Sequence, residues 1–358
     1  MKFSITPGNV KISGRTLYKD GIRFLGYPAT YISFRFNGRR ATASIISNPS
    51  MFPAECHAWI AVYIDNGKVP AKRIELKDSR QEILLYESND AREVAITIMK
   101  YSEPEFAICG LEFIETDSDI LLAPPGPKER RIQIIGDSIA CGYGVEGLAD
   151  RLECRTSEEN PSKAYSVLMA QILNADFEIV AWNGKGIITS YVGEEEDAVP
   201  DKSWLIPMLY KYTDAGCCRD YFKEPEEKWE LWEHSRFEPD IITIYLGTND
   251  ASYTRGIPVR EEEFIKNYLD FLGYIHTKHP DAAILCMLGT MDQSLCPAAS
   301  SAASIFKEKH PETNISYLKL PMQLEEDGTG TFWHPTYKTQ QKAAELIAGH
   351  IKQMMGWQ

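Results

Sequence analysis

Four short polar segments in the C-terminal two thirds of the chain each follow or adjoin an apolar, strand-like run. They are "GDS" (136–138), "WNGKG" (182–186), "LGTND" (246–250) and "FWHPT" (332–336). The carboxyl ends of parallel strands meet at one edge of a sheet, where such folds bind ligands. A serine, glycine amides, an asparagine and a histidine gathered there would supply the nucleophile, the oxyanion donors and the general base of an acyl-transfer site.

Ser138 is the candidate nucleophile. A turn from strand to helix presents a serine hydroxyl at the sheet edge, as the G-x-S-x-G elbow does, although "GDSIACG" does not match that motif. The alternative is a helix N-cap, a position that both Asp and Ser favour. We expect the neighbouring Asp137 to brace the turn and to take no part in the chemistry.

His334 is the candidate general base. It lies in a loop between Trp333 and Pro335, just before a predicted helix, whereas the other six histidines fall near helix ends, in a helix, in a polar stretch or in the N-terminal region. Catalytic groups are concentrated on loops that a rigid scaffold positions.

Residue type alone does not identify the oxyanion donors. Asn249 could form an Asx turn or donate its side-chain amide to a developing oxyanion. Gly184 and Gly186 could be ordinary turn glycines or could expose backbone N–H groups to a substrate. The order in which the four segments follow one another along the chain is what supports a catalytic role for these residues.

Strands alternate with helices beyond residue 130. The predicted strands are "RIQIIGD", "FEIVAWN", "DIITIYLG", "AAILCMLG" and "NISYLKL", and helical stretches such as "AYSVLMAQIL" and "EEFIKNYLDFLGYIHTKH" separate them. Fully apolar strands of this kind predict a parallel sheet covered by helices on both faces, a three-layer α/β/α domain. We also expect a solvated helix over 223–239.

The N-terminal region has a different hydrophobic pattern. Between Ser13 and Glu115 about seven short segments alternate apolar and polar residues, and Asn-Gly at 37–38 and 66–67 predicts hairpin turns. This pattern indicates an antiparallel β-sandwich of jelly-roll type. The proline-rich "LLAPPGPKER" then predicts a linker at 121–130, between a sandwich domain (1–120) and a catalytic domain (131–358).

Composition excludes several classes of function. The formal net charge is −13, which disfavours nucleic acids and anionic membrane surfaces as partners. The N-terminus lacks the apolar core of a secretory signal, and no apolar run reaches the roughly 18 residues of a membrane span. The eight cysteines are scattered, so we expect reduced thiols, a cytoplasmic protein, and an active site without metal or cofactor.

The four segments, in this order over 131–358, resemble the SGNH (GDSL-like) hydrolases. "GDSIACGYG", the "WHP" ending and the predicted jelly roll are similar, more narrowly, to carbohydrate esterase family two, whose two-domain members deacetylate xylan and glucomannan. The resemblance implies that Ser138 is the nucleophile and His334 the base. It implies an oxyanion hole of Ser138 N–H, the Asn249 amide and Gly186, with Gly184 as the alternative glycine.

The chain departs from the superfamily pattern beside the histidine. Relatives usually have an aspartate three residues before it, and here Thr331 stands there, followed by Phe332. The nearest acids are Asp327 and Glu326. Because some members of the esterase family orient this histidine with a backbone carbonyl, we expect a Ser-His dyad in which the carbonyl of Trp333 or a neighbour holds Nδ1–H. The alternative is that the loop folds back and Asp327 reaches the ring.

Aromatic residues suggest a sugar-binding wall. Trp333, Tyr143 and Trp204 are the candidates for substrate binding, whereas Trp182 ends a strand and is expected in the core. The predicted function is a serine esterase that removes acetyl groups from acetylated xylan oligosaccharides. The alternatives are a general carboxylesterase or thioesterase and a non-catalytic carbohydrate-binding protein. Sandwich edges also offer surfaces for a homo-oligomer.

Overall fold

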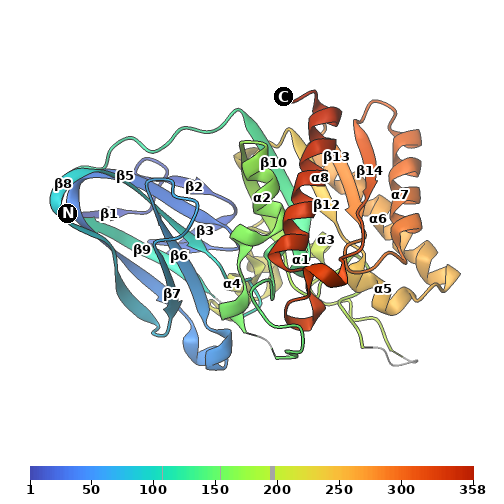
Figure 1. The fold of residues 1–358 in the computed structure, drawn as a ribbon, viewed down its shortest axis with the longest axis horizontal. Helices are drawn as coiled ribbons and strands as arrows, with labels where there is room; N and C mark the ends of the chain where they lie inside the picture. Colours follow the sequence, from blue (N-terminus) through green and yellow to red (C-terminus); the bar gives the residue numbers. More distant parts are fainter. Residues whose placement is uncertain (107, 154, 194–197) are drawn as a thin grey trace. The chain divides into compact units, whose positions relative to one another are not determined.

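The computed structural model describes residues 1–358 except 107, 154 and 194–197 (Figure 1). The chain forms two compact units. The N-terminal unit comprises Met1–Pro127 together with Cys154–Glu159 and Thr213–Leu231, and the C-terminal unit comprises Lys128–Glu153, Asn160–Tyr212 and Trp232–Gln358. The chain passes from one unit to the other near the expected linker. However, two segments that sequence analysis places in the catalytic domain belong to the N-terminal unit.

The N-terminal unit is built on one antiparallel sheet that carries a large apolar core, which confirms the predicted jelly-roll type of fold. Its main strand order is β3-β4-β9-β5-β8-β6-β7, with β1 beside β9 and β2 beside β5. The strands are β1 (Lys2–Ser4), β2 (Lys11–Ser13), β3 (Thr16–Lys19), β4 (Ile22–Leu25), β5 (Tyr31–Ser47), β6 (Ala58–Ile64), β7 (Lys72–Leu76), β8 (Arg80–Lys100) and β9 (Cys109–Thr116).

The hairpin predicted at Asn37-Gly38 is wrong. Both residues lie inside the 17-residue strand β5, opposite Glu93 and Arg92 of β8, and the register shifts between Gly38 and Arg40. A Cβ on Gly38 would lie 2.3 Å from Asp117 Oδ1, so glycine permits a close approach within a continuous strand. The second Asn-Gly does form a turn, since Gly67 N–H donates to Ile64 O between the antiparallel strands β6 and β7.

The segment Thr213–Leu231 is held in the N-terminal unit by a capped helix and aromatic packing. Asp214 accepts a hydrogen bond from Cys217 N–H at the start of α4 (Ala215–Asp220). The Phe24 ring lies 5.2 Å from that of Tyr221 and 5.4 Å from that of Phe222. The helix predicted over 223–239 is wrong: the structure has only the 3-10 turns Glu226–Lys228 and His234–Arg236 there. Pro225 and the need to bury two tryptophans explain the irregular path.

The C-terminal unit contains the predicted parallel sheet. Its order is β11-β10-β12-β13-β14, and every neighbouring pair is parallel. The strands are β10 (Arg130–Gly136), β11 (Ala175–Ala181), β12 (Ile241–Tyr245), β13 (Ala283–Leu288) and β14 (Ile315–Lys319). All five match the predicted apolar runs, because strands covered on both faces need continuous hydrophobic sequence.

Helices flank this sheet, as the α/β/α prediction requires. They are α1 (Ser138–Cys141), α2 (Tyr165–Ile172), α3 (Ile206–Leu209), α5 (Thr248–Thr254), α6 (Pro258–Lys278), α7 (Cys296–Lys309) and α8 (Tyr337–Met355). Helix α2 packs against α8, and α6 packs against α7 (Figure 1). Within the described residues, every helix is too short or too polar to serve as a membrane span.

Candidate active site

Ser138 is the first residue of α1, at the end of β10. Asp137 is the N-cap, and its Oδ1 accepts a hydrogen bond from Ile139 N–H at 3.0 Å. Asp137 therefore braces the turn, as expected, and the N-cap alternative for Ser138 does not apply. The serine hydroxyl is left to face the C-terminal edge of the sheet.

The structure brings Ser138 and His334 together from positions 196 residues apart. Ser138 Oγ–H donates to His334 Nε2 at 2.8 Å, and both side chains are mostly buried. A nucleophile and a base within this distance can exchange a proton directly. The Tyr143 ring covers the imidazole, with the two ring centres 4.8 Å apart.

A backbone carbonyl orients the imidazole. Thr331 O accepts a hydrogen bond from His334 Nδ1–H at 3.0 Å and another from His334 backbone N–H at 3.1 Å. Because a carbonyl can only accept, Nδ1 carries the proton and Nε2 presents its lone pair to the serine. The chain reaches this geometry through two left-handed residues, Phe332 (φ 51°) and Trp333 (φ 57°), which is unusual for side chains of this size.

Burial sets the protonation state of this histidine. It lowers the pKa of His334 from 6.5 to about 4, and the carbonyls of Thr331 and Phe332 oppose that effect only in part. The imidazole is therefore neutral at pH 7, as a general base has to be.

The two acids nearest in sequence are engaged elsewhere or exposed. The Asp327 carboxylate accepts hydrogen bonds from Lys342 Nζ at 2.6 and 2.9 Å, and Glu326 is exposed to solvent. The partner of His334 Nδ1 is thus the carbonyl of Thr331, whereas the carbonyl of Trp333 accepts a hydrogen bond from Gln323 Nε2 at 2.9 Å.

Asn249, in the segment "LGTND" that follows β12, lines the same cavity as Ser138. Its Nδ2 donates one hydrogen bond to Lys185 O at 3.1 Å, which fixes the plane of the amide. The second Nδ2 hydrogen can then serve an oxyanion.

The two candidate glycines occupy different surroundings. Gly184 (φ +70°) lines the cavity, whereas a Cβ on Gly186 would lie 2.5 Å from both Asp250 Oδ2 and Thr189 O. Gly186 thus packs closely against the Asp250 carboxylate and Thr189 O. The geometry favours Gly184 over Gly186 as the glycine that faces a ligand.

Asp250 fixes the loop that follows these glycines. Its buried carboxylate accepts hydrogen bonds from the backbone N–H groups of Ile187, Ile188 and Thr189, at 2.7 to 3.3 Å. Burial raises the pKa of Asp250 to about 6 in spite of these donors. Sequence analysis did not predict this positioning role, because Asp250 was considered only as the residue that follows Asn249 in a possible Asx turn.

Gln340 of α8 is a second positioning residue without a sequence signal. Its Oε1 accepts from Tyr165 N–H at 2.8 Å and its Nε2 donates to Ile139 O at 3.0 Å. The buried amide thereby joins α2, α8 and the helix that starts with Ser138. Only the fold brings these three helices to one amide.

The cavity at the dyad has a volume of 490 Å³. Its lining consists of Ser138, Tyr143, Leu152, Asn183, Gly184, Tyr191, Thr248, Asn249, Met291, Phe332, Trp333 and His334. These described residues are all uncharged at neutral pH, which suits a neutral ligand. Trp333, with 57% of its surface exposed, and Tyr143 line the cavity as predicted. Trp204 is absent from this lining and lies against the buried Trp182, with ring centres 6.3 Å apart.

A serine-histidine pair at the carboxyl edge of a parallel sheet has the geometry of an acyl-transfer enzyme, the class that includes the ester hydrolases. Residues 134–342 match the GDSL-like Lipase/Acylhydrolase family, and residues 12–125 match the Carbohydrate esterase 2 N-terminal family. The chain therefore belongs to the GDSL-like lipase/acylhydrolases, with the two-part organisation of family two carbohydrate esterases.

Individual relatives agree with this assignment. An acetylxylan esterase/glucomannan deacetylase of Cellvibrio japonicus is 27% identical over 98% of this chain and 90% of its own length. The cellulase/esterase CelE of Acetivibrio thermocellus is 26% identical over 91% of this chain, which spans 37% of that protein. A solved family two carbohydrate esterase from Cellvibrio japonicus has a TM-score of 0.84 at 25% identity, and covers 100% of this chain and 98% of its own.

Proposed function

We propose that this esterase removes O-acetyl groups from acetylated xylan or related oligosaccharides through a Ser138–His334 dyad. The observation that carries the proposal is the chain of hydrogen bonds from Thr331 O through His334 to Ser138 Oγ, within a neutral cavity that has aromatic walls. The names of the relatives, which include acetylxylan and glucomannan esterases, support a carbohydrate acetyl ester as the substrate.

In the acylation step, His334 Nε2 takes the hydroxyl proton while Ser138 Oγ attacks the ester carbonyl carbon. The negative charge that develops on the carbonyl oxygen is stabilised by Ser138 N–H, the free Asn249 amide hydrogen and a backbone N–H of the glycine turn, for which Gly184 is the better placed. Collapse of this intermediate breaks the bond to the sugar oxygen. His334 returns the proton to that oxygen, which leaves acetyl-Ser138 and a sugar hydroxyl.

In the deacylation step, water replaces the sugar. His334 Nε2 accepts a proton from the water as it attacks the acetyl carbon, and the same donors stabilise the second oxyanion. Acetate leaves, and Ser138 recovers its proton. During both steps the transient imidazolium has Thr331 O as its Nδ1 partner, and a carbonyl stabilises that cation less than a carboxylate would.

The cavity supports a sugar ester over an acidic substrate. Its uncharged lining offers no ion-pair partner to a charged ligand among the described residues. The exposed Trp333 ring stands beside His334, where the flat face of a pyranose could rest. The main alternative, a general carboxylesterase or thioesterase, predicts that longer acyl groups are accepted equally well.

The test is acetate release from acetylated xylo-oligosaccharides, compared with hydrolysis of p-nitrophenyl acetate and p-nitrophenyl octanoate. We expect kcat/KM to fall sharply from acetate to octanoate, and Ser138→Ala to lower the rate by several orders of magnitude while circular dichroism stays unchanged. Equal turnover of the octanoate would favour the general esterase. A Ser138→Ala variant with more than a tenth of the activity would refute the nucleophile.

A further inference from the structure

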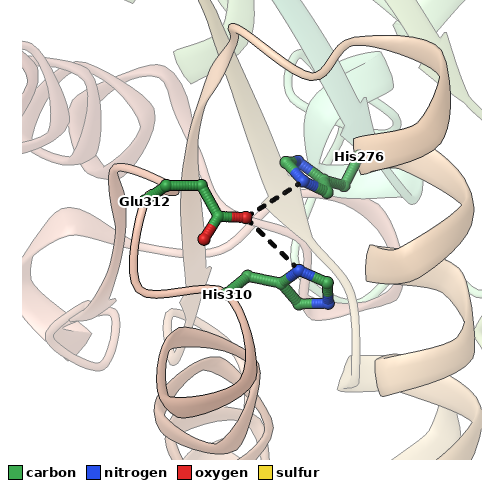
Figure 2. Close-up of side chains that lie close together, drawn as sticks. All are labelled: His276, His310 and Glu312. Carbon is green, nitrogen blue, oxygen red and sulfur yellow. Dashed lines mark ion pairs between the residues drawn. The ribbon is translucent and has the colours of Figure 1, made fainter.

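Three side chains converge at the other edge of the parallel sheet from Ser138 (Figure 2). His276 lies in the last turn of α6, His310 directly follows α7, and Glu312 lies in the turn that leads into β14. Glu312 Oε1 is 3.7 Å from His276 Nε2 and 3.5 Å from His310 Nδ1. His276 precedes β13, and His310 and Glu312 precede β14, whereas the dyad lies where β10 ends, so the cluster is separate from the active site.

We propose that His276, His310 and Glu312 bind a zinc ion that joins the end of α6 to the turn between α7 and β14. Two imidazoles and one carboxylate form a ligand set that zinc accepts in proteins, with water in the fourth position. The site would take no part in ester hydrolysis, since it lies away from the reacting groups.

The distances suit a tetrahedral ion. Ligands about 2.0–2.2 Å from zinc stand roughly 3.3–3.6 Å from one another at tetrahedral angles. The three ligand atoms here all lie within 4.8 Å of one another, and the two distances to Glu312 are already close to the required values. The widest separation, up to 4.8 Å, is therefore between the two imidazole nitrogens, and a rotation of the His310 ring, whose side chain is 38% exposed, has to close it.

Both imidazoles pack against the ring of Phe306. The buried Phe306 ring stacks on His310, with centres 4.5 Å apart and planes at 27°, and meets the His276 ring edge-on at 5.9 Å. His276 Nδ1 is buried, so Nε2 is the nitrogen that faces the carboxylate. His276, with a side chain only 17% exposed, is the more firmly held of the two rings, and His310 is the ring that adjusts on binding.

The neighbouring charges are compatible with a cation. Lys307 Nζ donates to Pro311 O at 2.8 Å and to Thr313 O at 2.7 Å, so this ammonium is tied to the carbonyls that flank Glu312 and holds the turn in shape. A carboxylate binds zinc in its ionised form, and an imidazole binds it in its neutral form.

The experiment titrates the full chain, freed of metal by a chelator, with zinc chloride in a calorimeter, and records the visible spectrum with Co²⁺ as a tetrahedral reporter. We expect one saturable zinc per chain and a tetrahedral cobalt spectrum. Glu312→Gln and His310→Ala should each weaken binding at least about tenfold, while the matched control His350→Ala, a histidine of the same unit that bonds to Ser316, should bind as the wild type does.

Several outcomes would overturn the inference. They are the absence of saturable zinc binding, binding that Glu312→Gln and His310→Ala leave unchanged, and calcium binding of equal strength. Because Glu312 is exposed, Glu312→Gln keeps the test valid even where a histidine variant does not fold. Zinc should raise the unfolding temperature of the wild type and not that of Glu312→Gln. Chelation should leave ester hydrolysis unchanged, which separates this test from that of the proposed function.

Discussion

Lowering the pH from 7 to 5 should barely change the kcat/KM of this esterase. The rate follows the fraction of His334 that is neutral, because only that form accepts the serine proton. Burial lowers the pKa of His334 to about 4. With that value about 90% of the imidazole is still neutral at pH 5, and kcat/KM falls by about 1.1-fold. An ordinary pKa of 6.5 would leave about 3% neutral and reduce the rate about 25-fold.

The assay is the initial rate of acetate release at low substrate concentration at pH 5, 6 and 7, with Ser138→Ala as the blank and circular dichroism at each pH. Asp137 and Asp250, whose pKa values burial raises to about 7 and about 6, titrate in the same interval. Asp137→Asn and Asp250→Asn variants remove these titrations, so a fall in rate that one of these variants abolishes belongs to that aspartate. A fall of tenfold or more that persists in the double variant would refute the reasoning about His334.

Three further predictions concern single side chains. Asp327→Asn and Glu326→Gln should each keep at least a third of the wild-type kcat, since Thr331 O holds His334. The loss of a true triad carboxylate costs about 10⁴-fold, so a hundredfold fall in acetate release would reveal a carboxylate partner. Asn249→Ala should reduce kcat by about 10²–10³-fold with little change in KM, if its amide serves the oxyanion; a change in KM alone would assign it to binding. Trp333→Ala should raise KM for acetylated oligosaccharides several-fold more than KM for p-nitrophenyl acetate, and equal effects on both would contradict a sugar-binding wall.

Much of the fold of this protein can be predicted from the sequence, because its strands have simple hydrophobic patterns. The five apolar runs of the C-terminal unit could only be strands covered on both faces, and their carboxyl ends had to gather Ser138, Asn249 and His334. The lack of an acid directly before His334 was equally visible, since Thr331, Phe332 and Trp333 occupy the three preceding positions. The N-terminal alternation likewise predicted an antiparallel fold.

Tertiary structure decided what local pattern cannot encode. Asn37-Gly38 has the sequence of a hairpin turn, yet long-range pairing of β5 with β8 keeps the strand continuous. The stretch 223–239 has helical composition, yet it straddles the limit between two compact units. Propensity is a weak prior that such non-local contacts override.

The finest details of the site also depended on the fold. The sequence could not name Thr331 as the source of the carbonyl, because that contact requires two residues in a left-handed conformation that large side chains seldom adopt. It could not choose between Gly184 and Gly186, because the choice depends on which glycine the buried Asp250 carboxylate contacts. The sequence determined which chemical groups are present and at which edge they meet. The packed chain alone fixed their distances, their protonation and the side on which each one faces a ligand.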